Sequence, residues 1–270
     1  CTNIIIKKKI KNVFYGFEDP DLRTFKKAKK ILNIKGIKTK LIKSKTFESF
    51  YRSYLINKKF GTPFITAKIA ISKDYFSINK KGKWITNIFS RKITHLLRSK
   101  HDGILSTSKS INYDNSLLNC RIEGLNNHKP DLFIIDLNLK LKKNLLLNKI
   151  LKKRKTYLIT YKTNIKKSHI YKKKGFKIIY INSLENKYDF DFLIKKIYKM
   201  GYSRILVETG LTFLNALIKN RLINDLYIFV TNYNLKKKGK NNATLKYLKN
   251  ILSKPMSIYL NNDKLHKKEF

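Results

Sequence analysis

The chain has 270 residues and carries 61 Lys and Arg against 17 Asp and Glu, which gives a formal net charge of +44. Such an excess of cations would suit a nucleic-acid or anionic-membrane partner. However, the Lys residues are spread over every segment, and only eight residues are Arg, the side chain that makes forked contacts to phosphates and bases. Lys, Ile, Asn, Phe and Tyr are enriched together, as a gene biased toward A and T would produce. The charge therefore predicts salt-sensitive binding to polyanions and no specific nucleic-acid partner.

The two Cys residues, Cys1 and Cys120, are too few for a disulfide framework and suit a reducing cytoplasm. No apolar run approaches the ~20 residues of a membrane span, so we expect a cytoplasmic protein without a membrane partner. Because position 1 is Cys and the first residues begin in mid-pattern, we also expect the chain to be a fragment.

The first part of the chain reads as two short strands and two helices, in the order strand 11–17, helix 22–36, strand 37–42 and helix 45–59. The Gly-Thr-Pro sequence at 61–63 then interrupts the regular pattern. We therefore predict a domain boundary here, with a first domain at 1–60 and a second at 61–270.

Strands alternate with helices after this break. The expected strands are 63–72, 102–108, 131–137, 156–160, 176–182, 203–209 and 225–232, and the expected helices are 86–100 (capped by Thr86), 189–200 and 211–220. Lys-rich runs such as 152–155 are expected to be loops. This alternation predicts an α/β fold on a mainly parallel sheet. Ligands of such sheets bind beyond the carboxyl ends of the strands, which are marked here by Ser72, Ser106, Glu208 and Thr209.

Lys68 lies inside the strand FITAKIAI, between two apolar residues. One interpretation is an edge Lys whose ammonium reaches water along the sheet. The other is a Lys that points into a site and orients or polarises a substrate oxygen.

Trp84, the only Trp, also has two interpretations. It is either a core residue or, given its Gly/Lys-rich loop, a ring that lies against a cofactor.

Arg98 ends the helix TNIFSRKITHLLR, and Arg121 follows a polar loop that contains Asp114. Each can be interpreted as a surface residue, as we interpret Arg91 in the middle of that helix. In a chain so poor in Arg, Arg98 and Arg121 together suit a phosphate held by guanidinium groups.

The segment VETG (207–210) ends a strand and opens the helix LTFLNALIKN. A carboxylate at a strand end, followed by a Gly turn, exposes backbone N–H groups at a helix N-terminus, where a cofactor phosphate can bind. Asp114 and Glu208 are the two carboxylates that we select for polar contacts or proton transfer. The five His residues show no metal-binding spacing.

Six segments occur in order, namely PFITAKIAISKD, KWIT, the helix ending LLR, HDGILS, the DNSLLNCR loop and ILVETG. Together they resemble one family, the reductase domain of the bifunctional riboflavin-biosynthesis deaminase/reductase, from about Gly61 to Asn232. Upstream, CTNIIIKKKIKNVFYGFEDPD resembles the tail of that family's deaminase domain, with Cys1 at the position of its last zinc-binding Cys. The final part of the chain matches poorly.

The resemblance implies a dihydrofolate-reductase-like α/β domain with a mainly parallel central sheet, preceded by a partial cytidine-deaminase-like α/β segment. It implies an NADPH-dependent oxidoreductase of riboflavin biosynthesis that opens and reduces the ribosyl ring of 5-amino-6-(5-phosphoribosylamino)uracil to a ribityl chain. The positions that face the cofactor are Ala70, Trp84, Ser110, Asp114, Glu208, Thr209 and Gly210. Those that face the substrate are Arg98, Leu118, Arg121 and Glu208, with the two Arg on the phosphate. The implied catalytic residues are Lys68, Asp114 and Glu208, the first two near the reacting ribose.

Zinc deaminases need three His or Cys ligands and a Glu that moves protons. Of these the chain has only Cys1, so zinc and deaminase activity are expected only with a complete deaminase domain. The implied partner is a phosphorylated pyrimidine, and the oligomeric state stays open, with a homo-oligomer among the alternatives.

The chain departs from the family pattern at several turns. Tyr75 replaces a Gly, Gly82 replaces a Ser that contacts phosphate, Ser116 replaces a Pro, and Thr209 replaces a second Gly. The alternative interpretation is therefore a catalytically impaired reductase-like fold that serves as a structural partner of the deaminase half.

Overall fold

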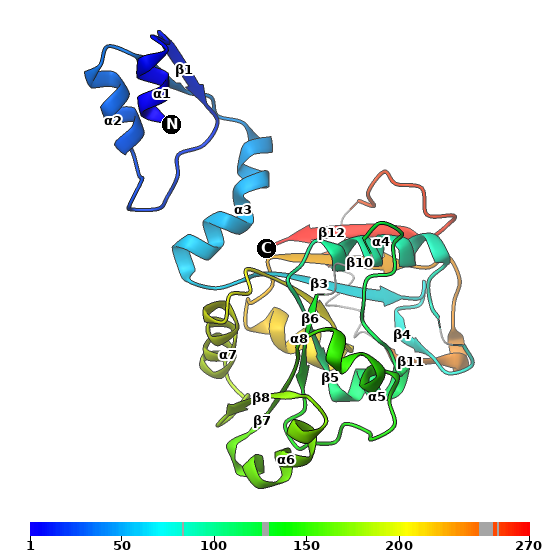
Figure 1. The fold of residues 1–270 in the computed structure, drawn as a ribbon. Coiled ribbons are helices and arrows are strands. Elements are labelled where there is room, and N and C mark those ends of the chain that lie inside the picture. Colours follow the sequence, from blue (N-terminus) through cyan, green and yellow to red (C-terminus); the bar gives the residue numbers. More distant parts are fainter. Residues whose placement is uncertain (83, 126–129, 243–250, 253) are drawn as a thin grey trace. The chain divides into compact units, whose positions relative to one another are not determined.

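The computed structural model describes residues 1–82, 84–125, 130–242, 251–252 and 254–270 (Figure 1). The chain divides into two compact units, Cys1–Pro63 and Phe64–Phe270. No helix among these described residues is long and apolar enough to cross a membrane.

The first unit contains a two-stranded parallel sheet and three helices, namely α1 (Thr2–Lys7), β1 (Asn12–Tyr15), α2 (Lys27–Ile34), β2 (Lys38–Leu41) and α3 (Lys45–Phe60). Helix α2 begins later than the predicted 22–36, because Lys26 adopts a left-handed conformation (φ 52°) that interrupts the helix. The hydrophobic side chains of Leu32 and Ile37 are buried, whereas those of Leu22 and Phe50 are 86% and 76% exposed. The unit therefore has little hydrophobic core of its own.

The second unit is built on an eight-stranded sheet with the strand order β12-β10-β3-β9-β5-β6-β7-β8. The neighbouring strands are parallel, except that β12 is antiparallel to β10. This confirms the predicted α/β fold with a mainly parallel sheet. The strands are β3 (Phe64–Ile71), β5 (Gly103–Thr107), β6 (Asp131–Ile135), β7 (Thr156–Tyr161), β8 (Lys177–Ile181), β9 (Arg204–Glu208), β10 (Asp225–Val230) and β12 (Lys264–Glu269).

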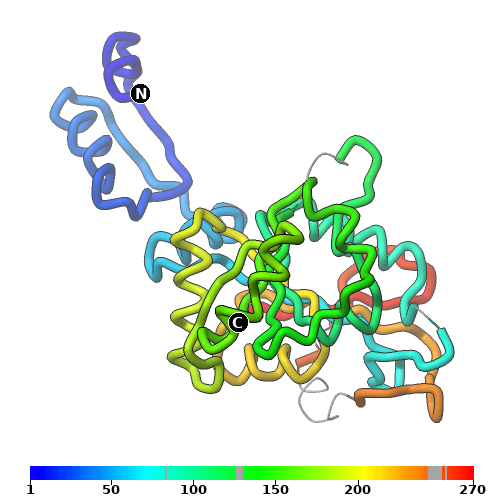
Figure 2. The backbone as a smooth tube through the Cα atoms, turned by 60° about the horizontal axis from the view of Figure 1, so that its bottom comes forward, coloured from blue at the N-terminus to red at the C-terminus, as the bar shows by residue number. Residues whose placement is uncertain are grey.

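The sheet separates two hydrophobic cores, whose covering helices can be followed in Figures 1 and 2. Leu193 of α7 (Lys187–Lys199) and Leu214 of α8 (Leu211–Lys219) belong to one core. Leu97 of α4 (Ile88–Ser99) and Leu147 of η1 (Leu146–Lys153) belong to the other. The remaining helical segments are α5 (Ser108–Asp114), η2 (Lys162–Asn164), α6 (Ile165–Lys173) and η3 (Lys236–Lys238).

The inner strands are mainly apolar because both of their faces are covered. On β6, Leu132 and Ile134 lie in the core under α4, while Phe133 and Ile135 lie in the core under α7 and α8. This period of two explains why the inner strands could be predicted from continuous apolar runs.

A separate antiparallel pair joins β4 (Phe76–Asn79) to β11 (Gly239–Asn242). The turn before β4 contains Tyr75 in a left-handed conformation (φ 68°), the region in which glycine is favoured. This costs a non-glycine residue about 1–2 kcal/mol. The Tyr75 side chain packs against the core under α7 and α8, and the Asp74 carboxylate accepts hydrogen bonds from the backbone N–H groups of Leu235 and Lys236 at 2.9 and 2.7 Å. The fold therefore accommodates this departure from the family pattern.

The N-cap of α4 is Asn87, so the prediction of Thr86 was wrong by one residue. Asn87 Oδ1 accepts a hydrogen bond from the backbone N–H of Ser90 at 3.1 Å. Its side-chain amide also donates to the carbonyls of Leu260 and Asn261, at 2.5 and 2.9 Å. Thr and Asn are both good N-caps. The cap falls on Asn87 because its side chain also binds the carbonyls of Leu260 and Asn261, which are distant in the sequence.

Asp114 does not lie in a polar loop, as predicted, but is the last residue of α5. The sequence SKSINYD contains weak helix formers, so its local pattern does not indicate a helix. The helix forms because the Thr107 hydroxyl accepts a hydrogen bond from the Ser110 N–H at 3.2 Å and because Ile111 is fully buried.

We expect Asn87→Ala to lower the free energy of unfolding by about 1–2 kcal/mol, because it removes the cap hydrogen bond and the two contacts to the carbonyls at 260 and 261. Urea denaturation followed by circular dichroism measures this. Thr86→Val is the matched control, since it removes the neighbouring hydroxyl and should cost less than about 0.5 kcal/mol. A larger loss for Thr86→Val than for Asn87→Ala would show that the cap is misassigned.

Candidate active site

The carboxyl ends of β3 and β9 place two charged side chains next to each other. Lys68 and Glu208 are register partners in this parallel pair. Two residues away on the same strands, Ala70 and Leu206 contribute to the core under α4, so Lys68 and Glu208 point to that face of the sheet. Arg98, in the last turn of α4, reaches Glu208 from above this face. The site thus lies where ligands of parallel sheets bind.

Arg98 and Glu208 form a buried ion pair with two hydrogen bonds. Arg98 Nε donates to Glu208 Oε1 at 2.6 Å, and Nη2 donates to Oε2 at 2.9 Å. The two side chains are only 11% and 9% exposed. Burial alone would raise the pKa of Glu208, but the charge and hydrogen bonds of Arg98 hold it below its ordinary value. Burial likewise opposes the charge on Arg98, yet Glu208 raises the pKa of Arg98 above its ordinary value. Both groups are therefore ionised at neutral pH.

Lys68 is the third charge of this cluster. Burial is the main cause that lowers the pKa of Lys68, and the nearby charges of Glu208 and Asp114 oppose the shift. Its ammonium lies 5.6 Å from the centroid of the Phe229 ring. An ammonium with a lowered pKa gives up its proton more readily than an ordinary Lys. The structure therefore places two of the predicted catalytic residues, Lys68 and Glu208, side by side, while Asp114 lies at the exposed end of α5 and acts on Lys68 through its charge.

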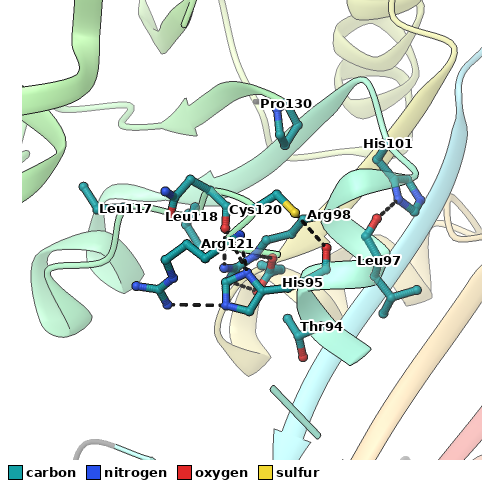
Figure 3. A network of polar contacts seen from close by, with 12 residues as sticks. Thr94, His95, Leu97, Arg98, His101, Leu117, Leu118, Cys120, Arg121 and Pro130 are labelled. Atoms are coloured by element: carbon teal, nitrogen blue, oxygen red, sulfur yellow. Dashed lines mark hydrogen bonds and ion pairs between the residues drawn. The ribbon is translucent and has the colours of Figure 1, made fainter. Parts of the chain in front are cut away.

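The predicted phosphate side of the site is a short segment, the 117–121 loop, drawn in Figure 3. Leu118 in this loop is buried and has a left-handed backbone (φ 49°). The carbonyl of Asn119 accepts a hydrogen bond from Arg98 Nη1 at 3.0 Å. Arg121 at the end of the loop is exposed. The loop is thus attached to the ion pair at its middle residue, Asn119, and carries a solvent-facing guanidinium at its last residue, Arg121.

His95 lies beside Arg121 and one helical turn before Arg98 on α4 (Figure 3). Its Nδ1 is 3.1 Å from the Asn119 carbonyl, and its Nε2 is 3.4 Å from Arg121 Nη2. The backbone N–H of Arg121 also points at Nδ1, at 3.2 Å. With its proton on Nδ1 the neutral ring donates to the carbonyl and accepts from Arg121 Nη2, whereas with its proton on Nε2 it accepts from the backbone N–H of Arg121. Burial, then the charges of Arg98 and Arg121, lower the pKa of His95 to about 4, so the ring is neutral at physiological pH.

His95 was not among the predicted site residues, because the five His residues show no metal-binding spacing. The signal that could have revealed it is its position three residues before Arg98, which puts both side chains on one helix face.

A turn rich in hydroxyl groups follows Glu208. The backbone N–H of Gly210 donates to Ser110 Oγ at 3.1 Å, and Ser110 Oγ lies 3.0 Å from Thr107 Oγ1. The Thr209 hydroxyl donates to Thr107 Oγ1 at 3.5 Å. Gly210 is the N-cap of α8 and provides no side-chain cap for that helix. Helix N–H groups and hydroxyls therefore gather here in an arrangement that suits a phosphate.

Ala70 and Trp84 occupy different places relative to this cluster. Ala70 lies two residues after Lys68 on the same strand and the same face. Trp84 is half-exposed, and the Arg91 guanidinium lies 4.7 Å from its ring centroid. Trp84 precedes the N-terminus of α4, whereas Arg98 lies at the other end of that helix, so Trp84 is not part of the charged cluster. Arg91 is partly buried rather than a plain surface residue.

Cys1, the predicted zinc ligand, is exposed in the first unit. Over the described ranges of the chain, no three His, Cys, Asp or Glu side chains gather closely enough to hold a metal ion.

The fold and this charged cluster define an α/β protein with a titratable site at the carboxyl ends of parallel strands. Residues 63–235 match the family model described as the RibD C-terminal domain. The chain belongs to this family.

Three comparisons illustrate the relationship. The riboflavin biosynthesis protein RibD of Buchnera aphidicola is 29% identical over 263 residues, and the match covers 85% of this chain and 64% of that protein. The 2,5-diamino-6-ribosylamino-4(3H)-pyrimidinone 5′-phosphate reductase of Debaryomyces hansenii is 25% identical over 205 residues, covering 67% of this chain and 79% of that protein. The solved structure of Acinetobacter baumannii RibD matches with a TM-score of 0.78 at 20% identity, and the match covers 100% of this chain and 75% of the Acinetobacter chain. This likeness shows a shared fold.

We expect Glu208→Gln to lower the free energy of unfolding by about 3 kcal/mol at pH 7, because Arg98 then lacks its buried anionic partner. Folding lowers the pKa of Glu208, so its contribution is fully present above the ordinary pKa of 4.5 and is lost as the pH falls through the lowered value. The difference between wild type and variant should therefore shrink in acid, as measured by urea denaturation from pH 7 downward.

Glu185→Gln serves as the control, because Glu185 is exposed in the segment before α7. It should change stability by less than about 0.5 kcal/mol across the same pH range. A difference for Glu208→Gln that stays constant in acid would mean that the carboxylate charge is not what stabilises the site.

Proposed function

We propose that this chain is an NADPH-dependent reductase of 5-amino-6-(5-phosphoribosylamino)uracil, which converts the ribosyl group to ribityl in riboflavin biosynthesis. The observation that carries the proposal is the cluster of Lys68, Arg98 and Glu208 at the ends of β3 and β9. Family membership supports it, as does the Debaryomyces hansenii relative, which is named as the reductase of a ribosylamino-pyrimidinone 5′-phosphate. The presence of all three charges favours an active reductase over a catalytically impaired structural partner.

In this proposal the substrate phosphate binds at the 117–121 loop. Arg121 has an exposed guanidinium that can make two parallel hydrogen bonds to phosphate oxygens. Arg98 already uses three of its five N–H donors, on Glu208 and on the Asn119 carbonyl, and the remaining two complete the phosphate contacts. His95, which lies beside Arg121, is neutral and therefore adds no negative charge that would compete with the phosphate for the Arg121 guanidinium. Leu118 and Glu208 border the rest of the substrate.

The proposed cofactor site begins at the N-terminus of α8. The hydroxyl-rich turn of Ser110, Thr209 and Gly210 suits a cofactor phosphate. Ala70 has a small side chain beside Lys68, and the half-exposed Trp84 offers a ring against which part of the cofactor can lie. Bound NADPH supplies the hydride that the reduction needs.

We assign the proton transfer to Lys68 and the orientation of the sugar to Asp114. When the C1′–O4′ bond of the ribose opens, the Lys68 ammonium donates a proton to O4′, and C1′ becomes doubly bonded to the exocyclic nitrogen. C1′ then accepts the hydride, and the electron pair of the C=N bond returns to the nitrogen, which has kept its own N–H, so the proton given to O4′ is the one proton consumed. Asp114 orients the sugar from the end of α5, while Glu208, fixed by Arg98, holds Lys68 at the strand ends.

The first unit is proposed to be the C-terminal part of a zinc deaminase domain, covering residues 1–60, with the reductase domain at 61–270. Its small core, with Leu32 and Ile37 buried, suits a segment that completes a larger domain. Cys1 would bind zinc only together with ligands from a complete deaminase domain.

We expect the wild-type protein to oxidise NADPH with the pyrimidine substrate, followed by the loss of NADPH absorbance. Lys68→Met should lower kcat by about 10²- to 10⁴-fold, because the proton donor to O4′ is lost.

Arg121→Gln should raise the KM for the substrate by about tenfold or more with a smaller change in kcat, because the forked phosphate contact is lost.

Lys73→Met is the matched control, since Lys73 is an exposed Lys just beyond the end of the same strand. It should change kcat and KM by less than about twofold. The affinity for NADPH, followed by quenching of Trp84 fluorescence, should likewise stay within about twofold in all three variants. Absence of NADPH oxidation by the wild-type protein would refute the proposed function.

A further inference from the structure

Arg154 is a buried cation within a basic run. Lys152, Lys153 and Lys155 are exposed, whereas Arg154 is only 7% exposed. It follows η1 with an extended backbone (φ −156°, ψ 157°) and precedes β7. The 152–155 run, which was expected to be a loop, therefore contains one buried side chain, that of Arg154.

The guanidinium of Arg154 donates to three backbone carbonyls. Nη1 donates to the carbonyls of Leu118 and Pro130 at 2.7 and 3.2 Å, and Nη2 donates to the carbonyl of Leu117. Burial, then the charge of Arg98, lower the pKa of Arg154 to about 10, so it keeps its charge at neutral pH. A buried cation held by neutral carbonyls gains less than one held by a carboxylate. Stability alone therefore explains Arg154 poorly.

The same loop is held from its other side by α4. Arg98 Nη1 donates to the Asn119 carbonyl at 3.0 Å, so three consecutive carbonyls, those of Leu117, Leu118 and Asn119, each accept a hydrogen bond from a buried Arg. Leu118, in the middle, has the left-handed backbone that is unfavourable for a Leu. The two guanidinium groups together select this unusual conformation of the loop.

We propose that Arg154 is a positioning residue, which holds the 117–121 loop in the conformation that presents Arg121 to the phosphate of the substrate. It acts through the loop and does not touch the substrate. This inference rests on the proposed function, in which Arg121 binds that phosphate. Lys cannot replace Arg154, because one ammonium on a flexible stem cannot reproduce the fixed spacing of Nη1 and Nη2 against neighbouring carbonyls.

The test compares Arg154→Lys with the wild-type protein. We expect the KM for the pyrimidine substrate, and the Kd for ribose 5-phosphate measured by calorimetry, to rise by about tenfold. The kcat and the Kd for NADPH should change by less than about twofold, because the cluster of Lys68 and Glu208 is untouched. Arg204→Lys is the matched control, a partly buried Arg at the amino end of β9, and should leave all four values unchanged.

A double variant separates positioning from a general structural role. In an Arg121→Gln background, Arg154→Lys should raise the Kd for ribose 5-phosphate by less than about twofold, because its effect passes through Arg121. Equal effects in both backgrounds would overturn the proposal, and so would a matching loss of NADPH affinity. Arg154→Met removes the buried charge altogether and gives the same comparison if the Lys variant does not fold.

The two proposals fail in different ways. If the wild-type protein binds ribose 5-phosphate but does not turn over the pyrimidine, the proposed reaction is refuted. The Kd values for ribose 5-phosphate would then still test the role of Arg154. If the wild-type protein turns over the pyrimidine and Arg154→Lys leaves the KM unchanged, only the proposed role of Arg154 is refuted.

Discussion

The ion pair between Arg98 and Glu208 is the interaction on which the rest of the site depends. It joins the last turn of α4 to the carboxyl end of β9, across 110 residues of sequence. Because both side chains are buried, each keeps the other ionised. Glu208 in turn supplies the anion next to Lys68, and Arg98 holds the carbonyl of Asn119. Lys68, the 117–121 loop and the turn into α8 are thus all connected to a single buried contact.

The scarcity of Arg in this Lys-rich chain helps to identify the site. The Lys residues are numerous and spread over all segments, but three of the eight Arg, namely Arg98, Arg121 and Arg154, gather around one short loop. Arg98 and Arg154 each use more than one guanidinium nitrogen, which the single ammonium of a Lys cannot do. Arg is therefore retained, against the compositional bias, where the geometry of a fork is needed.

The inner strands could be predicted from the sequence because continuous apolar runs mark strands that are covered on both faces. The strand-end rule pointed to Glu208, and the family resemblance named Lys68, Arg98 and Arg121. Helix α5, built from weak helix formers, and the N-cap Asn87 could not be predicted, because contacts distant in sequence determine them. The same holds for Arg154, whose contacts to backbone carbonyls span 24 to 37 residues, whereas the position of His95 on the helix face of Arg98 was a local signal. Local patterns carry no information on such pairs.

The most direct test of the account follows deuterium from NADPH doubly deuterated at C4 through turnover of 5-amino-6-(5-phosphoribosylamino)uracil. Mass spectrometry and NMR of the ribityl product would count the label and locate it. We expect one deuterium, bound at C1′, because in the proposed reaction the hydride goes to the carbon that ring opening exposes beside Lys68. A product without deuterium, or with deuterium on another carbon, would refute the proposed reaction.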